Sequence, residues 1–295
     1  MSVRAAFQTA AAEGRAALVP FIAAGDPDLD ATVAVAQAAA EAGADVLEIG
    51  VPYSDPLADG PVIQAAYTRA LAGGATLDGL FAAVARIAGA VTTPVVLMTS
   101  ISPVLARGMD RFCQDAADAG AAGILVPDLL PEDAEPLRTA ADSAGLETVF
   151  LTVPWADDDR ARAAAEASTG FVYLVSRRGV TGEGGADQGG TDKAGASGPS
   201  GALERAVDRV RTFTNLPVAV GFGVATPEDA AEVAAVADGV IVGTTLVRAI
   251  HDAAVAATGE GSGDAGAAAA TRTVVSGLRA AVDSVERAKT RKAGA

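Results

Sequence analysis

The chain has 295 residues, of which half are hydrophobic and a fifth are charged. This length exceeds the roughly 100–200 residues of a typical domain, so it suits either two small domains or one large barrel. The formal net charge of −15 argues against a general binder of nucleic acid or of anionic membranes, since both need a cationic face on the protein.

The sequence also bears on the compartment and on metal chemistry. The first residues lack the apolar core of a signal peptide, and no run of 18 or more apolar residues follows. We therefore expect a soluble, cytoplasmic protein. The single cysteine, Cys113, excludes an internal disulfide framework, and with the single histidine, His251, it leaves little for a zinc site. We expect packing or helix-surface roles for both residues.

Short β-rich runs alternate along the chain with alanine-rich stretches of helical periodicity. Their nearly continuous apolar character predicts parallel strands that are buried on both faces and connected by helices. Eight such repeats predict an α/β fold, a single (β/α)8 TIM barrel with extra helices. The alternative is an open doubly wound sheet, but "FIAAGDPDLD" follows the first run, where that fold would carry G-x-G-x-x-G. The eight predicted strands span residues 17–22, 45–50, 94–99, 122–127, 148–152, 171–175, 217–222 and 239–243.

Two segments interrupt this pattern within the predicted single domain, residues 1–295. Residues 182–201 are rich in glycine and have little to bury, which predicts a long mobile loop inserted after the sixth strand. Residues 258–269 predict a loop before a last helix at about 270–289, and we expect residues 290–295 to form a frayed tail.

The second predicted strand carries an acid inside the apolar run "VLEIG". Because side chains alternate along a strand, Leu47 and Ile49 point away from Glu48, and we expect its carboxylate to point into the barrel. Burial there raises the pKa of a carboxyl group toward the range useful for general acid–base catalysis. The alternative is a structural acid paired with a buried cation, although the neighbouring predicted strands carry no basic residue.

The loop "SDPLADGP" follows this strand and contains Asp55 and Asp59. Aspartate before proline or glycine is a common turn former, so turn chemistry alone explains either residue. The loop begins close to the strand that carries Glu48, however, so one of the two can share its pocket.

The ends of the last three predicted strands are rich in glycine: "SRRGVTG", "GFGVATPED" and "VGTTLV". Helix N-termini flanked by glycine bind phosphate, and the loops after strands seven and eight are the usual phosphate site of a barrel. The sequence thus predicts a phosphorylated small-molecule substrate.

With these residues in view, the chain resembles the tryptophan synthase α chain family. The stretch "LEIGVPYSDPLADGPVIQ" at 47–64 is similar to the family signature almost letter for letter. The resemblance extends in the correct order over nearly the whole chain. Supporting matches are "PFIAAGDPD" at 20–28, "LVPDLLPEDA" at 125–134, "YLVSRRGVTG" at 173–182 and "VGFGVATPEDA" at 220–230.

The resemblance implies a retro-aldol cleavage of indole-3-glycerol phosphate to indole and glyceraldehyde 3-phosphate. By this resemblance, Glu48 is the general acid–base, which deprotonates the side-chain hydroxyl and helps to deliver a proton to indole carbon 3. Asp59 matches the family's second aspartate, which binds the indole N–H and stabilises positive charge on the ring. Differing environments can keep two carboxyl groups in these different roles.

The remaining site residues are also implied only by the resemblance. Tyr173 matches a tyrosine near the catalytic acid, and Thr181 matches a loop threonine that contacts the aspartate when the loop closes and excludes water. The expected indole pocket includes Phe21 and Phe222. The expected phosphate ligands are the amides of Gly182, Gly223, Gly243 and Thr244.

The family pattern further implies no metal or organic cofactor in this chain. The expected partner is a β chain that carries pyridoxal phosphate, takes up the indole and forms an α2β2 heterotetramer. The segment "LMTSISPVL" departs from the pattern "LMTYYNPVL" at Ser100, Ile101 and Ser102, near the expected partner contact. This leaves open a stand-alone lyase that releases free indole. Two further alternatives are a weakly active phosphate-binding activator of the β chain and a different barrel enzyme of phosphorylated intermediates.

Overall fold

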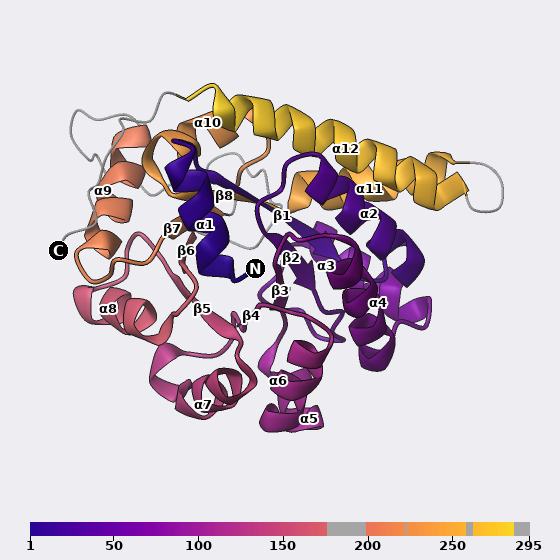
Figure 1. Ribbon diagram of the computed structural model, residues 1–295, viewed down its shortest axis with the longest axis horizontal. Helices are drawn as coiled ribbons and strands as arrows, with labels where there is room; N and C mark the ends of the chain where they lie inside the picture. Colours follow the sequence, from indigo (N-terminus) through magenta and orange to yellow (C-terminus); the bar gives the residue numbers. More distant parts are fainter. Residues whose placement is uncertain (176–198, 222, 258–261, 286–295) are drawn as a thin grey trace.

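The computed structural model describes residues 1–175, 199–221, 223–257 and 262–285. Within these ranges, parallel strands pair in sequence order from β1 to β8, and β8 returns to β1 to close a barrel (Figure 1). The predicted (β/α)8 fold is therefore confirmed. The strands are β1 (Ala17–Ala23), β2 (Leu47–Gly50), β3 (Val95–Met98), β4 (Gly123–Leu125), β5 (Glu147–Thr152), β6 (Val172–Val175), β7 (Val218–Gly221) and β8 (Gly239–Val242).

Helices surround the barrel and connect successive strands (Figure 1). Several begin at residues that cap free backbone N–H groups, such as Asp28, Thr76 and Asp157. The helices are α1 (Val3–Ala12), α2 (Leu29–Glu41), α3 (Pro61–Ala72), α4 (Leu77–Ala90), α5 (Ile101–Arg107), α6 (Met109–Asp118), the 3-10 helix η1 (Pro131–Asp133), α7 (Glu135–Ala144), α8 (Asp158–Ala167), α9 (Pro199–Arg211), α10 (Pro227–Val236), α11 (Thr244–Ala256) and α12 (Ser262–Asp283).

The strand residues are buried on both faces, as their apolar runs predict. Leu47 and Ile49 pack in the layer between strands and helices, whereas Val46 belongs to the cluster inside the barrel. The strict alternation of side chains thus separates two cores. The inner cluster takes residues from all eight strands or their immediate flanks: Ala17, Val19, Val46, Val96, Leu125, Val149, Tyr173, Ala219 and Ile241.

Helix α1 packs against the amino-terminal end of the barrel. Val3 and Phe7 join the inner cluster, and the rings of Phe7 and Phe171 lie 5.1 Å apart. Gly239 provides the space for this contact, since a Cβ atom there would lie 2.6 Å from the Phe7 ring. With this end covered, access to the interior is left to the carboxyl ends of the strands.

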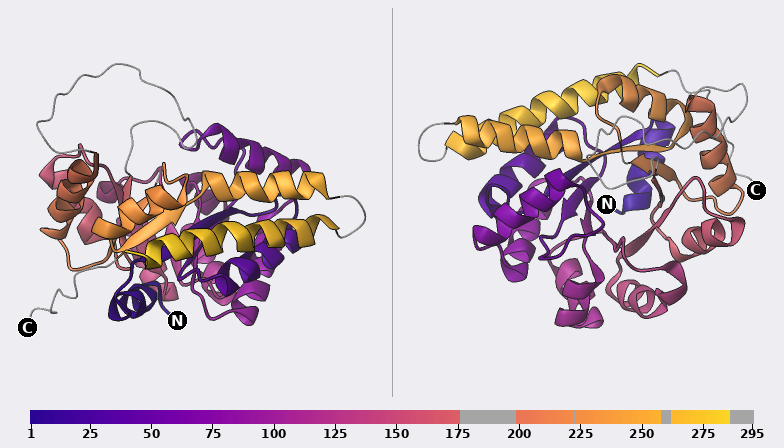
Figure 2. Two further views of the ribbon diagram at one scale, coloured as in Figure 1. Left: turned by 90° about the horizontal axis from the view of Figure 1, so that it is seen from above. Right: turned by 180° about the vertical axis from the view of Figure 1, so that it is seen from behind.

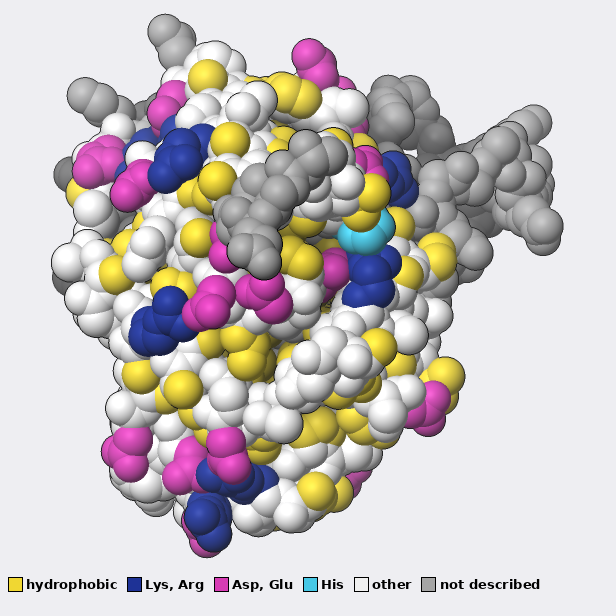
Figure 3. Space-filling view, turned by 90° about the vertical axis from the view of Figure 1, so that its right-hand side faces the viewer, with side chains coloured by type: hydrophobic (Ala, Val, Ile, Leu, Met, Phe, Trp, Pro, Cys, Tyr) yellow, Lys and Arg dark blue, Asp and Glu magenta, His cyan; other side chains and the backbone are white. Residues whose placement is uncertain are grey.

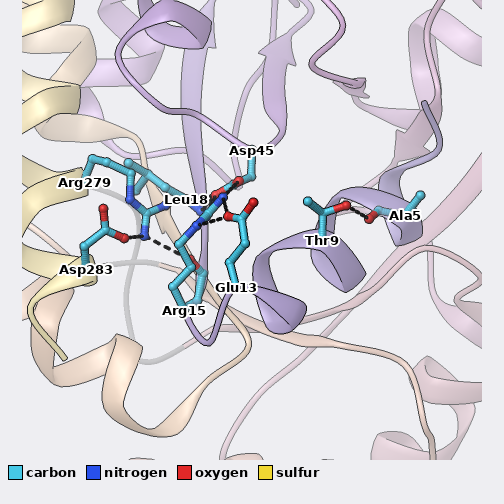
Figure 4. A network of polar contacts seen from close by, with 9 residues as sticks. Ala5, Thr9, Glu13, Arg15, Leu18, Asp45, Arg279 and Asp283 are labelled. Atoms are coloured by element: carbon cyan, nitrogen blue, oxygen red, sulfur yellow. Dashed lines mark hydrogen bonds and ion pairs between the residues drawn. The ribbon is translucent and has the colours of Figure 1, made fainter. Parts of the chain in front are cut away.

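At the amino-terminal end of the barrel, a charged cluster connects the segment before β1 with the last helix, α12 (Figure 4). Asp45 accepts hydrogen bonds from both terminal nitrogens of Arg15, at 2.7 and 2.8 Å, and from the backbone N–H of Leu18 at 2.8 Å. Arg279 of α12 adds a bond to Asp45 at 3.0 Å and an ion pair with Asp283 at 2.6 Å. The cluster fixes α12 against the start of β2.

Two of the predicted irregular segments need correction. Residues 262–269 are not a loop, because α12 begins at Ser262 and ends at Asp283; its alanines pack against α2 and α11, and Figure 2 shows α11 and α12 side by side. Residues 182–198 of the expected loop lie outside the described residues. Its last three residues, 199–201, are not a loop but the first turn of α9, which begins at a proline, a residue common at the first position of a helix. The expected tail, 290–295, also lies outside the described residues.

The single cysteine and the single histidine both lie on helices, in the packing or helix-surface positions expected of them. Cys113 is fully buried in α6, and this burial raises the pKa of its thiol to about 11, with a smaller effect of the charge of Asp110. His251 is half-buried on α11. On the side of the molecule in Figure 3, basic side chains are scattered among acidic ones and form no continuous cationic face.

Among the described residues, no single helix is both long and apolar enough to cross a membrane. Helices α3 and α4 meet such a test only as a pair, and they are bent by 105° relative to each other.

Candidate active site

Glu48 lies on β2 between Phe21 of β1 and Val96 of β3, and its side chain is buried inside the barrel. Neither carboxylate oxygen has a hydrogen-bond partner among the described residues, and no described lysine or arginine forms an ion pair with it. The alternative of a structural acid neutralised by a buried cation therefore finds no support here. Burial raises the pKa of Glu48 to about 8, and the negative charge of Asp59 adds to this shift.

Asp59 is held by the loop that connects β2 to α3. Its backbone N–H donates to the carbonyl of Pro56 at 3.0 Å, and its carbonyl accepts a bond of 2.7 Å from the side-chain amide of Gln64. The same amide reaches the carbonyl of Pro56 at 3.3 Å, so Gln64 ties both ends of the turn together. Burial, together with the charge of Asp128, raises the pKa of Asp59 to about 6.

The structure distinguishes the two aspartates of this loop. Asp59 is buried beside Glu48, with 8% of its surface exposed, whereas Asp55 is exposed. Of the two aspartates, only Asp59 is thus withdrawn from solvent together with Glu48. Asp55 remains at the rim.

A cavity of about 340 Å³ opens at the carboxyl ends of β2, β3 and β4. Its size falls at the lower end of the range for sites that bind small organic molecules. Apolar walls are interrupted by a few carboxylates and hydroxyls. The lining residues are Val51, Tyr53, Asp55, Pro56, Leu57, Ala58, Asp59, Tyr67, Met98, Thr99, Ser100, Pro127 and Asp128.

Tyrosines approach the two acids from separate elements, Tyr173 from β6 and Tyr67 from α3. Both phenols are buried, and burial raises the pKa of each, with additional contributions from the charges of Glu48 and Asp59. Phe21 packs with Tyr67 in one small cluster. Tyr173 and Phe21 were expected at the site from the sequence, whereas Tyr67 was not.

Sequence reasoning missed Tyr67 because it occupies an ordinary core position of a helix. It lies four residues after Ile63 and three before Ala70, and all three side chains are buried. The one available signal is that α3 directly follows the loop that carries Asp59.

Asp128, the other residue that sequence reasoning missed, organises the segment that departs from the family pattern. Its carboxylate accepts bonds from the hydroxyl of Ser100 and, at 2.9 Å, from the backbone N–H of Ile101. It therefore caps the first turn of α5, although it lies in the loop after β4. Through its charge, this loop is linked electrostatically to Asp59.

The expected phosphate ligands that the structure describes lie at the ends of β7 and β8. Gly223 has a φ angle of +97°, which favours glycine. Gly243 precedes Thr244, the first residue of α11, and no described side chain caps this helix, so its first-turn N–H groups can bind an anion. The hydroxyl of Thr245 binds the carbonyl of Ala225 at 3.1 Å and joins the two loops.

Three other expected site residues cannot be placed in this geometry. Thr181, Gly182 and Phe222 lie outside the described residues. Among the described residues, no group of three or more histidine, cysteine, aspartate or glutamate side chains has an arrangement that could hold a metal ion.

Comparisons with known proteins identify the family of the chain. The family model "Tryptophan synthase alpha chain" matches residues 7–275. A tryptophan synthase alpha chain of Phenylobacterium zucineum is 45% identical over 85% of this chain and 87% of its own length, and one of Geobacter sulfurreducens is 46% identical over 79% and 84%.

Solved structures point to the same family. The chain matches a Mycobacterium tuberculosis tryptophan synthase structure with a TM-score of 0.81 and 37% identity, covering 95% of this chain and 97% of the other. It matches tryptophan synthase subunit alpha of Legionella pneumophila with a TM-score of 0.82 and 32% identity, covering 97% of this chain and 100% of the other. From its sequence, its fold and the arrangement of its buried acids, the chain belongs to the tryptophan synthase alpha chain family.

Proposed function

We propose that this chain cleaves indole-3-glycerol phosphate into indole and glyceraldehyde 3-phosphate, with Glu48 as the general acid–base and Asp59 as the partner of the indole N–H. The observation that carries the proposal is the buried state of Glu48. Both of its oxygens lack a partner among the described residues, and its pKa of about 8 lies close to neutral pH. A group that must both accept and donate a proton works best with such a pKa.

The proposed reaction balances without any further reactant. With the help of Glu48, a proton is delivered to indole carbon 3. This gives an indolenine whose positive charge is shared by the ring nitrogen, and the carboxylate of Asp59 stabilises this charge through the N–H. Glu48 removes the proton from the hydroxyl on the neighbouring side-chain carbon. The O–H electrons form the aldehyde C=O bond, the bond to ring carbon 3 breaks, and its electrons restore the aromatic indole. The scheme uses carboxyl groups alone and no cofactor of this chain.

The phosphate of the substrate is proposed to bind at the ends of β7 and β8. The first turn of α11 at Thr244, which has no side-chain cap among the described residues, supports this placement together with Gly243 and Gly223. Thr181 and Gly182 complete the proposed site as residues of the loop that covers it. Phe21 and Phe222 are proposed to hold the indole ring, with Tyr173 beside Glu48.

A β chain with pyridoxal phosphate is the proposed partner in a cytoplasmic α2β2 complex. Exposed apolar side chains in the loops after β2, β4 and β5 support an interface at the carboxyl end of the barrel: Leu57, Leu130 and Trp155. A stand-alone lyase is the second candidate, because the departing segment at Ser100 is tied to Asp128 within this chain.

The test is indole release from indole-3-glycerol phosphate by purified protein, with a β chain added or withheld. Glu48→Gln and Asp59→Asn should each lower turnover about 10²- to 10⁴-fold. Glu166→Gln, which neutralises an exposed glutamate of α8, is the matched control and should keep wild-type turnover. Full activity of Glu48→Gln would refute the assignment. Stimulation by the β chain supports the complex, and its absence favours the stand-alone lyase.

A further inference from the structure

Ionised Glu48 needs hydrogen-bond donors that the structure does not yet bring to it. As the general base of the proposed function, Glu48 must carry a negative charge at one stage, and a buried carboxylate without donors is strongly destabilised. The titratable side chains near it, among the described residues, are Asp59, Tyr67 and Tyr173. Its strand neighbours, Phe21 and Val96, are apolar. Among these titratable side chains, the two tyrosines are the ones that keep a donor proton when both acids are ionised.

The hydroxyl of Tyr67 lies on the inner face of β2. A Cβ atom added at Gly50 would lie 2.3 Å from this oxygen and 2.5 Å from the ring of Phe21. Gly50 follows Glu48 by two residues, so both face the barrel interior, roughly 6.6 Å apart along the strand. A glutamate side chain spans most of this distance. A change of the Glu48 rotamer can therefore carry its carboxylate toward the Tyr67 hydroxyl.

The Tyr67 hydroxyl is also available for such a bond. Its side chain is 3% exposed and lines the cavity together with Asp59. No hydrogen bond from this hydroxyl is present among the described residues, in contrast to the neighbouring Thr68, whose hydroxyl donates to the carbonyl of Gln64 at 2.8 Å. The Tyr67 phenol also stays protonated near neutral pH, because burial and the charges of both acids raise its pKa.

We propose that Tyr67 is a positioning residue of the active site, whose hydroxyl donates a hydrogen bond to the ionised carboxylate of Glu48 and holds it in its reactive orientation. This inference rests on the proposed function for its kinetic consequence, but the hydrogen bond itself does not depend on the identity of the substrate. Gly50 is the residue that makes room for it.

The decisive variant is Tyr67→Phe, which removes one oxygen atom and leaves the ring in place. Loss of a donor to the charged form raises the pKa of Glu48, by roughly one unit for a bond to a charged group. We expect the acidic limb of the pH profile of kcat to move to higher pH by this amount. At pH 7, kcat should fall about tenfold, while KM changes less than about twofold.

Thr68→Val is the matched control. It removes a hydroxyl from the next residue of the same helix, on the exposed side, and should leave the pH profile unchanged. Thermal unfolding of Tyr67→Phe should stay close to that of wild type, because the hydroxyl makes no bond to the described residues. A large loss of stability together with an unshifted pH profile would show that Tyr67 has only a structural role and would overturn the proposal.

A second readout separates this inference from the proposed function. Carboxyl carbons of glutamate are labelled with 13C, the Glu48 signal is assigned with Glu48→Gln, and its titration is followed by NMR without substrate. A higher pKa of Glu48 in Tyr67→Phe supports the hydrogen bond even if the protein releases no indole. An identical titration in wild type and Tyr67→Phe overturns it even if the protein is an active lyase.

Discussion

Glu48 and Asp59 lie close enough inside the barrel mouth for the negative charge of Asp59 to raise the pKa of Glu48, in addition to the larger effect of burial. The pKa of Glu48 is about 8 in the folded chain, against an ordinary value of 4.5 for an exposed glutamate. Between these values the folded protein binds more protons than the unfolded one. The free energy of unfolding therefore falls as the pH rises through this window, by up to about 1.4 kcal/mol per pH unit.

Glu48→Gln should consequently be more stable than wild type, by a margin that grows from pH 5.5 to pH 8. Urea unfolding at several pH values measures this margin. Glu166→Gln, the exposed control, should differ from wild type by a constant amount. A margin for Glu48→Gln that does not depend on pH would show that Glu48 is already ionised, and thus bonded, in the folded chain.

Asp128 should control the protonation of Asp59. Asp128→Asn removes a negative charge that raises the pKa of Asp59, but keeps a side-chain oxygen for the backbone N–H of Ile101. We expect the pKa of Asp59 to fall below its value of about 6, and indole release to extend to lower pH. NMR titration of 13C-labelled aspartate carboxyl groups, assigned with Asp59→Asn, measures the shift.

A matched control is Asp133→Asn, an exposed aspartate in η1 on the same connection. It should leave the titration of Asp59 unchanged. An equal shift in both variants would mean that net charge, and not the proximity of Asp128, sets the pKa of Asp59.

The barrel could be predicted because each of its strands lies in a nearly continuous apolar run followed by a helical pattern. The inward direction of Glu48 followed from strand alternation in the same way, and the structure confirms it. The start of α12 was missed because the glycines before Ala267 indicate a loop, while the contacts of α12 with α2 and α11 stabilise a helix. Local propensity gave way to tertiary packing there.

The active site shows a second limit of sequence reasoning. Asp55 and Asp59 are equivalent as turn formers, and only the folded loop shows which one is buried. Tyr67 and Asp128 reach the site from a helix and from a loop that are far apart in the sequence. No local pattern reports such proximity, which depends on closure of the whole barrel.

The cluster around Asp45 should stabilise the fold without affecting catalysis. Arg279→Ala removes a largely buried partner of Asp45 and the side chain that covers Gly43, and should lower the free energy of unfolding by about 3 kcal/mol. Arg86→Ala, which breaks an exposed pair with Asp30, should cost less than about 1 kcal/mol. Urea unfolding measures both values.

Indole release per folded molecule should be unchanged in Arg279→Ala at a temperature where it stays folded. Asp45 precedes β2 and its partners lie outside the barrel interior, whereas the Glu48 side chain points into the barrel and Asp59 lies in the loop after β2. A large loss of turnover without a loss of stability would instead connect this cluster to the active site.

Gly221 should be required for the position of Tyr173. A Cβ atom at Gly221 would lie 2.2 Å from the hydroxyl oxygen of Tyr173 and 2.7 Å from its ring, so Gly221→Ala must displace the phenol from the acids. We expect kcat to fall about tenfold and the free energy of unfolding to fall by about 1–3 kcal/mol through overpacking. Gly277→Ala, on α12, is the control, because a Cβ atom there would have no neighbour within 4 Å. This substitution should stabilise the helix by roughly 0.5–1 kcal/mol. Wild-type kcat in Gly221→Ala would show that the position of the Tyr173 hydroxyl does not matter for turnover.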